Sequence, residues 1–151
     1  MAPTVERPLV VAVINSSPDV IDMLRIAFEH AGFLVVSTFT FAIRNGEVDL
    51  EAFLRLHRPA AIIYDLAPPY KNNWQLFLHL REVPGFQDRP IILTSTNPRR
   101  LQEFADVGQA VFEVMETPYE INNLIDTVAR ATGRRLSSSD GPNADRAPAG
   151  S

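Results

Sequence analysis

The chain has 151 residues, of which 46% are apolar and 21% charged, and this balance predicts one globular domain with a substantial core. A net charge of −4 argues against a nucleic-acid surface, which usually carries a basic stripe. The absence of cysteine excludes disulfides, thiolate nucleophiles and cysteine-ligated zinc. The first apolar run, Leu9–Ile14, is too short for a signal-peptide core or a membrane span, so we expect a cytoplasmic protein without membrane contact.

Both ends of the sequence differ in composition from the middle. Residues 1–8 are mostly polar with two prolines, and they predict a loose N-terminal tail. Residues 134–151 are rich in Ser, Gly, Pro, Ala and Asp, and such a segment cannot bury enough apolar surface to offset its ordering entropy. We therefore expect one domain over residues 9–133 and a disordered C-terminal tail.

The domain opens with a strand followed by a helix. The continuously apolar run Leu9–Ile14 predicts a parallel strand that is covered on both faces. Ser17 suits a helix N-cap, and Pro18 suits the first helical position. The predicted helix ends at Gly32, and its apolar face at helical spacing consists of Ile21, Leu24, Phe28 and Ala31.

A second strand and a second helix follow. Leu34–Thr38 predicts the strand, and residues 39–48 predict a rather long connection around an Asn-Gly pair. Asp49 suits the N-cap of a helix over residues 50–57, with Phe53 and Leu56 on its inner side.

The rest of the domain repeats the alternation of strands and helices. Strands are predicted at residues 60–64, which end at Asp65, at 90–94 and at 111–115. Helices are predicted at residues 74–81, at 98–107 and after Pro118, where apolar residues recur at helical spacing.

Five strands that alternate with helices predict an α/β domain with a parallel sheet covered by helices on both faces. The flavodoxin-like strand order 2-1-3-4-5 suits five such units, which form a three-layer (βα)5 sandwich. Ligands of these sheets bind beyond the carboxyl ends of the strands. The polar residues expected there are Asn15, Ser16, Asp65, Ser95 and Thr117.

Three segments together resemble the receiver domain of bacterial response regulators. Ile63–Pro69 is similar to the family's third-strand motif, in which an aspartate is followed four positions later by proline, as Asp65 is here. Pro90–Ser95 is similar to the fourth strand, which ends in a hydroxyl residue thirty positions after the aspartate (95 − 65). Met115–Tyr119 is similar to the end of the fifth strand, where a proline and an aromatic residue occur.

The resemblance implies a role for each of these residues. Asp65 is the candidate phosphoacceptor, and Ser95 and Thr117 are candidates for contacts with the phosphoryl oxygens. Asp65, the amide oxygen of Asn15 and the carbonyl of Ala67 are the candidate ligands of a weak Mg²⁺ site.

The sequence also departs from the family pattern. Asn15 and Ser16 occupy the positions of the acidic pair that holds Mg²⁺, and Thr117 occupies the position of the lysine before the proline. Phosphoryl transfer to a carboxylate brings two anions together, and the missing charges are the ones that would offset their repulsion. These changes predict a pseudo-receiver with impaired phosphorylation.

Simpler structural roles remain open for the same residues. Asp65 would then cap the loop after its strand, and Ser95 would bond to nearby backbone. Asn15 would satisfy the amides of its own turn. The Thr117–Pro118 peptide bond is either cis, as the resemblance implies, or Pro118 starts the last helix.

The expected function is non-enzymatic signalling through contact with another protein, either a histidine kinase or a downstream effector. Arg99, Arg100 and Tyr119 are candidates for the partner-binding face, and we expect a monomer or weak homodimer. One alternative is a working single-domain response regulator that is phosphorylated on Asp65. Another is a flavodoxin-like protein that binds flavin or nucleotide, but the loop at residues 15–17 lacks the glycines that let backbone approach a phosphate.

Overall fold

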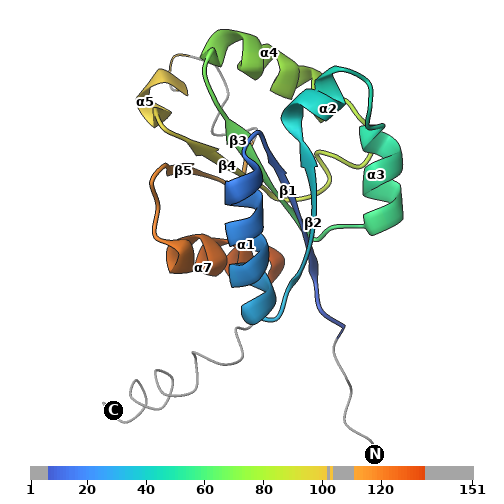
Figure 1. Ribbon diagram of the computed structural model, residues 1–151, viewed down its shortest axis with the longest axis vertical. Helices are drawn as coiled ribbons and strands as arrows, with labels where there is room; N and C mark the ends of the chain where they lie inside the picture. Colours follow the sequence, from blue (N-terminus) through green and yellow to red (C-terminus); the bar gives the residue numbers. More distant parts are fainter. Residues whose placement is uncertain (1–6, 102, 104–110, 135–151) are drawn as a thin grey trace, which may run out of the picture.

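The computed structural model describes residues 7–101, 103 and 111–134. Its centre is a parallel five-stranded sheet in the order β2-β1-β3-β4-β5, which confirms the predicted order (Figure 1). The strands are β1 (Val10–Asn15), β2 (Leu34–Phe39), β3 (Ala61–Leu66), β4 (Ile91–Ser95) and β5 (Glu113–Glu116).

Helices cover both faces of this sheet. In Figure 1, α1 and α7 lie on one face, and α2, α3 and α4 lie on the other. The helices are α1 (Pro18–His30), α2 (Thr40–Arg44), α3 (Leu50–His57), α4 (Tyr70–Arg81), α5 (Pro98–Leu101) and α7 (Ile121–Thr132). Within the described residues, no helix is both long enough and apolar enough to cross a membrane.

The continuous apolar runs of the strands contribute side chains to two hydrophobic cores, one on each face of the sheet. Successive side chains of a strand point to opposite faces, so Val11 and Val13 pack against α1 and α7, while Ala12 and Ile14 pack toward α3 and α4. All four are fully buried. This two-sided burial is the physical reason why the strands read as unbroken apolar segments.

The predicted ends of α1 are confirmed. Ser17 Oγ accepts a hydrogen bond from the Val20 amide at 3.2 Å, and Pro18 is the first helical residue. The chain leaves the helix at Gly32, whose φ of +98° suits a residue without a Cβ atom. These local signals fix where β1 passes into α1, beside the site described below.

Two sequence-based expectations for residues 39–57 were wrong. The connection predicted there contains a short helix, α2, which buries Thr40, Ala42 and Ile43 and ends just before the Asn-Gly pair. Leu56 was expected on the inner side of α3 but is 76% exposed. The inner face follows Leu50 and Leu54, four residues apart, and Leu56 lies two residues further round the helix.

Several boundaries also shift. α4 begins at Tyr70 rather than Trp74, and β5 begins two residues later than predicted. Trp74 is buried and stacks on Phe77. The predicted helix over residues 98–107 is described only as far as Leu101, and most of the two predicted tails lies outside the described residues.

Candidate functional site

Asp65 lies near the carboxyl end of β3, between the ends of β1 and β4. Thr94 is its direct neighbour on β4, and the Thr94 hydroxyl donates a hydrogen bond to Asp65 Oδ1 at 2.7 Å. Burial raises the pKa of the Asp65 carboxyl above its ordinary value, and the hydrogen bond from Thr94 opposes this shift. Asp65 is therefore a partly buried carboxyl group, and its hydrogen-bond donor, Thr94, is a neutral residue.

Ser95 occupies a different environment. It is fully buried, pairs with Leu66 rather than Asp65, and its Oγ accepts a hydrogen bond from the Asn97 amide at 3.1 Å. This is the backbone-bonding role considered for it from the sequence. The hydroxyl bonded to Asp65 belongs to Thr94, which sequence reasoning missed because spacing along the chain does not define the register between two strands.

The three oxygens expected to bind Mg²⁺ are each engaged within the protein. Asn15 Oδ1 accepts a hydrogen bond from the Ser17 amide at 2.9 Å, and the Ala67 carbonyl accepts one from Asn73 Nδ2 at 2.6 Å. Asp65 contributes the only carboxylate of the three. Among the described residues, no group of three or more His, Asp or Glu side chains could hold a metal ion. This donor set is poorly suited to Mg²⁺, which requires near-octahedral oxygen coordination.

A pocket of about 350 Å³ lies beside Asp65, between α1 and the segment after β5. We call it the Thr117 pocket; its lining residues are Asn15, Ser17, Val20, Met23, Asp65, Thr96, Thr117, Pro118 and Tyr119. No lysine or arginine is among these residues. Thr117 Oγ1 is buried and has no hydrogen-bond partner in the described part of the chain.

The end of this pocket is shaped by the segment after β5. The Thr117–Pro118 peptide bond is cis, and α7 begins only at Ile121, so Pro118 is not the first residue of that helix. Tyr119 lines the pocket, and its pKa is raised by burial and, to a smaller extent, by the Asp65 carboxylate. The neutral side chain of Tyr119 thus lines the same pocket as the Asp65 carboxyl group.

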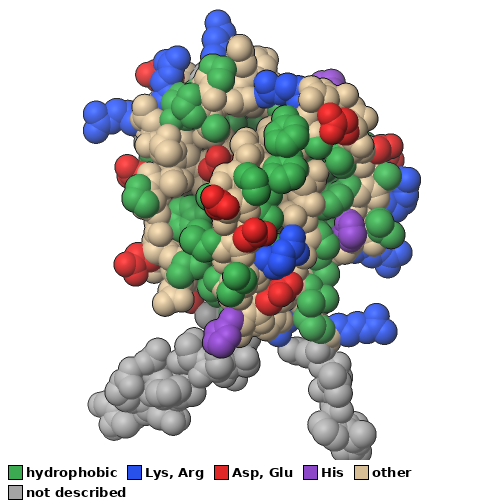
Figure 2. Space-filling model, viewed as in Figure 1, with side chains coloured by type: hydrophobic (Ala, Val, Ile, Leu, Met, Phe, Trp, Pro, Cys, Tyr) green, Lys and Arg blue, Asp and Glu red, His purple; other side chains and the backbone are tan. Residues whose placement is uncertain are grey.

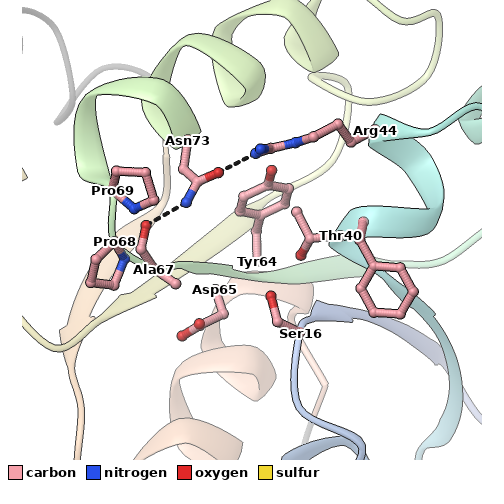
Figure 3. A pocket seen from close by; sticks show the side chains of 10 residues that line it. Ser16, Thr40, Arg44, Tyr64, Asp65, Ala67, Pro68, Pro69 and Asn73 are labelled. Atoms are coloured by element: carbon pink, nitrogen blue, oxygen red, sulfur yellow. Dashed lines mark hydrogen bonds between the residues drawn. The ribbon is translucent and has the colours of Figure 1, made fainter.

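A second pocket lies on another side of Asp65 (Figure 3). We call it the Arg44 pocket; it is lined by Ser16, Thr40, Phe41, Arg44, Tyr64, Asp65, Ala67, Pro68, Pro69 and Asn73. The Arg44 guanidinium donates a hydrogen bond to Asn73 Oδ1. The sequence did not identify Thr40 and Arg44 as site residues, because residues 39–48 were predicted to be an irregular connection. The available signal was their spacing of four residues, which places two side chains on the same side of a helix.

The three residues proposed for the partner face lie on two segments, α5 and the stretch between β5 and α7. Arg99 and Arg100 are exposed on α5, and Arg100 pairs with Glu103. Tyr119 packs with the α1 and α7 core, whereas α5 buries Leu101 in the core on the opposite face of the sheet. The structure brings together Asn15, Ser16, Asp65 and Thr117 around one strand end, as the sequence predicts.

Several solved structures share this architecture. A sensor protein from Polaromonas sp. JS666 is 26% identical, with a TM-score of 0.67 over 85% of this chain and 98% of that chain. A response regulator receiver protein from Burkholderia phymatum is 16% identical, with a TM-score of 0.64 over 86% and 99% of the two chains. Chemotaxis protein CheY4 from Vibrio cholerae is 19% identical, with a TM-score of 0.62 over 82% and 98%.

No protein-family model matches the sequence, and no curated protein matches it. The structural likeness defines the class: the chain has the fold of a CheY-like response-regulator receiver domain. Within that fold, it carries Asp65 at the end of β3 but Asn15, Ser16 and Thr117 around it.

Proposed function

We propose that the chain is a receiver-like signalling protein that acts through protein–protein contact and in which phosphorylation of Asp65 is impaired. The observation that carries this proposal is that no Lys or Arg of the described residues forms an ion pair with Asp65. Its carboxyl group is partly buried, and the Thr117 pocket beside it is lined by neutral residues only, apart from Asp65 itself.

Electrostatics explain why this arrangement opposes phosphoryl transfer. A phosphoryl donor brings negative charge to a carboxylate, and catalysis depends on positioned cations that stabilise the charge in the transition state. Thr117 offers a hydrogen bond but no charge. Asn15 and Ala67 offer neutral oxygens that are already hydrogen-bonded.

A partner surface is available on α1. Met23 and Ile26, three residues apart on this helix, are 48% and 71% exposed. Figure 2 shows apolar side chains exposed on the face of the molecule that carries α1. Apolar side chains at this spacing lie on one side of a helix and suit the core of a protein interface. Met23 also lines the Thr117 pocket, so a partner seated on α1 would lie next to Asp65.

The test is the intact mass of the protein after incubation with acetyl phosphate and Mg²⁺, with Asp65→Asn as the matched control. We expect no added phosphoryl group in either protein. A mass gain of one phosphoryl group in the wild type that disappears in Asp65→Asn would contradict the proposal and identify a functional switch.

One observation favours the working response regulator as the second candidate. The buried Thr117 hydroxyl has no hydrogen-bond partner among the described residues and lines the same pocket as Asp65. A phosphoryl oxygen on Asp65 would supply an acceptor for it. A phosphorylated wild type in which Thr117→Val loses the modification faster would support this candidate.

A further inference from the structure

The Arg44 pocket contains two buried hydroxyl groups that have no hydrogen-bond partner in the described part of the chain. They are Tyr64 Oη and Thr40 Oγ1, on side chains that are 0% and 8% exposed. Buried polar groups are almost always hydrogen-bonded, because an unmet donor or acceptor loses its water without compensation. Two such groups lining one pocket therefore indicate a hydrogen-bonding ligand that comes from outside the described part of the chain.

A cation lies beside these hydroxyls. Arg44 is exposed on α2, and its guanidinium donates to the neutral Asn73 amide, which is held in place by its own bond to the Ala67 carbonyl. In Figure 3 this bond passes beside the Tyr64 hydroxyl. Burial raises the pKa of Tyr64, and the positive charge of Arg44 opposes this rise. No Asp or Glu of the described residues forms an ion pair with Arg44. The guanidinium thus retains donors in a planar fork that matches a carboxylate.

An apolar rim borders the same pocket. Phe41 is 49% exposed and stacks on Phe39 with ring centroids 4.9 Å apart. The exposed residues Pro68 and Pro69 also line the pocket. A flat apolar group could lie against this rim while a polar group reaches the hydroxyls.

We propose that the Arg44 pocket binds a small organic monoanion, whose carboxylate is held by Arg44, Thr40 and Tyr64 and whose flat apolar body lies against Phe41 and the prolines. Asp65 lines the same pocket and opposes a negative ligand, but its carboxylate turns away from Arg44 in Figure 3 and is hydrogen-bonded to Thr94. This opposing charge favours a monoanion over phosphate, which carries more charge. The proposal stands whether or not Asp65 can be phosphorylated, because the binding groups named are Arg44, Thr40 and Tyr64.

The test is a titration of the full chain, followed by ¹H–¹⁵N NMR, with benzoate, acetate and inorganic phosphate as separate probes. We expect saturable shifts at residues 40, 44 and 64, with benzoate binding more tightly than acetate and acetate more tightly than phosphate. Arg44→Gln should weaken benzoate binding by about tenfold or more, because a charge-assisted hydrogen bond is lost. Arg55→Gln removes the same charge from an exposed site on α3 and should leave the affinity unchanged.

Three results would overturn the proposal: no saturable shift with any probe, which would mean an ordered water only; the tightest binding by phosphate; or equal affinity in Arg44→Gln. Asp65→Asn should bind benzoate more tightly, because the opposing charge is removed. Asp65→Asn cannot be phosphorylated on residue 65 but keeps Arg44, Thr40 and Tyr64. The benzoate titration therefore tests the binding proposal independently of the intact-mass test of phosphorylation.

A second measurement separates a binding role of the hydroxyls from a structural one. Tyr64→Phe and Thr40→Val each remove a buried hydroxyl that has no partner, so we expect a higher melting temperature without ligand and weaker benzoate binding. Lower melting temperatures with unchanged affinity would assign the hydroxyls to the fold and overturn their role in binding.

Discussion

At the scale of single residues, Asp65 combines burial with a neutral partner. Thr94 donates one hydrogen bond to it, but burial is the larger influence and raises the pKa of the carboxyl group. The folded state therefore binds the proton of Asp65 more tightly than the unfolded chain does. Ionised Asp65 consequently opposes folding, and protonated Asp65 does not.

The pH dependence of stability follows from this sign. As pH rises from the ordinary pKa of 3.8 through the raised pKa of Asp65, this residue should lower the free energy of unfolding. Asp65→Asn keeps an acceptor for Thr94 and removes the charge, so we expect a higher melting temperature than wild type at neutral pH. The difference should vanish below pH 3.8.

Thermal unfolding from acid to neutral pH checks this expectation, and Asp126→Asn, on the exposed side of α7, is the charge-matched control. A neutral-pH gain as large in Asp126→Asn as in Asp65→Asn would show that overall charge, and not the environment of Asp65, sets the effect.

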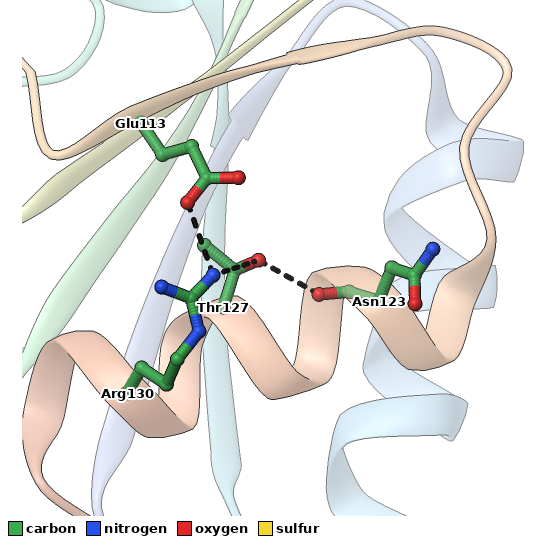
Figure 4. Close-up of polar contacts among 4 residues, drawn as sticks. All are labelled: Glu113, Asn123, Thr127 and Arg130. Carbon is green, nitrogen blue, oxygen red and sulfur yellow. Dashed lines mark hydrogen bonds and ion pairs between the residues drawn. The ribbon is translucent and has the colours of Figure 1, made fainter.

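At the scale of elements, arginines on α1 and α7 bond to the two edge strands of the sheet, β2 and β5. Arg25 on α1 donates to the Val35 carbonyl at 2.8 Å and to Ser37 Oγ at 2.9 Å, both on β2. Arg130 on α7 pairs with Glu113 at 3.0 Å, at the start of β5, and also bonds to Thr127 (Figure 4). Edge strands carry unpaired backbone groups, and Arg25 satisfies one of them.

The two arginines should differ in their effect on stability. Arg25→Ala should lower the free energy of unfolding by about 1–3 kcal/mol, because it leaves a backbone carbonyl and a hydroxyl without their charged donor. Arg130→Ala should cost less than about 1 kcal/mol, since its ion pair is largely exposed. Urea unfolding of both variants provides the comparison, and equal losses would contradict the assignment of Arg25 as the stronger link.

At the scale of the whole molecule, the chain has the fold of a receiver domain. It lacks the acidic pair and the lysine that receiver domains place around the aspartate. Clustered carboxylates repel one another until a cation binds, and Asn15 and Ser16 avoid this repulsion. Under the proposed function, the chain holds one conformation and presents a constant surface to its partner.

Introducing the charges of the resembled pattern should make Asp65 able to accept a phosphoryl group, and it should lower the stability of the protein without metal. We expect the triple variant Asn15→Asp, Ser16→Asp, Thr117→Lys to have a lower melting temperature without metal. Mg²⁺ at about a hundred times its dissociation constant should recover about 2.7 kcal/mol. The variant should then accept a phosphoryl group from acetyl phosphate, detected by intact mass, and Asp65→Asn in the same background should not.

The triple variant also tests the argument from charge. A variant that is folded and binds Mg²⁺, but remains unmodified, would show that charge alone does not account for impaired phosphorylation. The double variant Asn15→Asp, Ser16→Asp separates the contribution of the metal from that of the lysine.

The sequence alone determined the order of the strands and of the helices other than α2, the parallel sheet and the position of Asp65 at a strand end. These features depend on local signals: the apolar run of β1, the cap at Ser17 and the cap at Asp49 act on residues nearby in the chain. Propensity and capping are short-range effects, so they can be read without knowledge of distant contacts. The segment with Asn45-Gly46 misled the prediction, because α2 is only five residues long and is stabilised by burial of Ile43.

The tertiary structure decided which groups meet Asp65. The register between β3 and β4 places Thr94, and not Ser95, beside the carboxyl group, and register is a property of two strands together. The Arg44 pocket likewise forms only when α2 and the start of α4 lie over the end of β3. Contacts between segments distant in the chain depend on the packing of the whole sheet, which is the physical reason why spacing in the sequence could not define them.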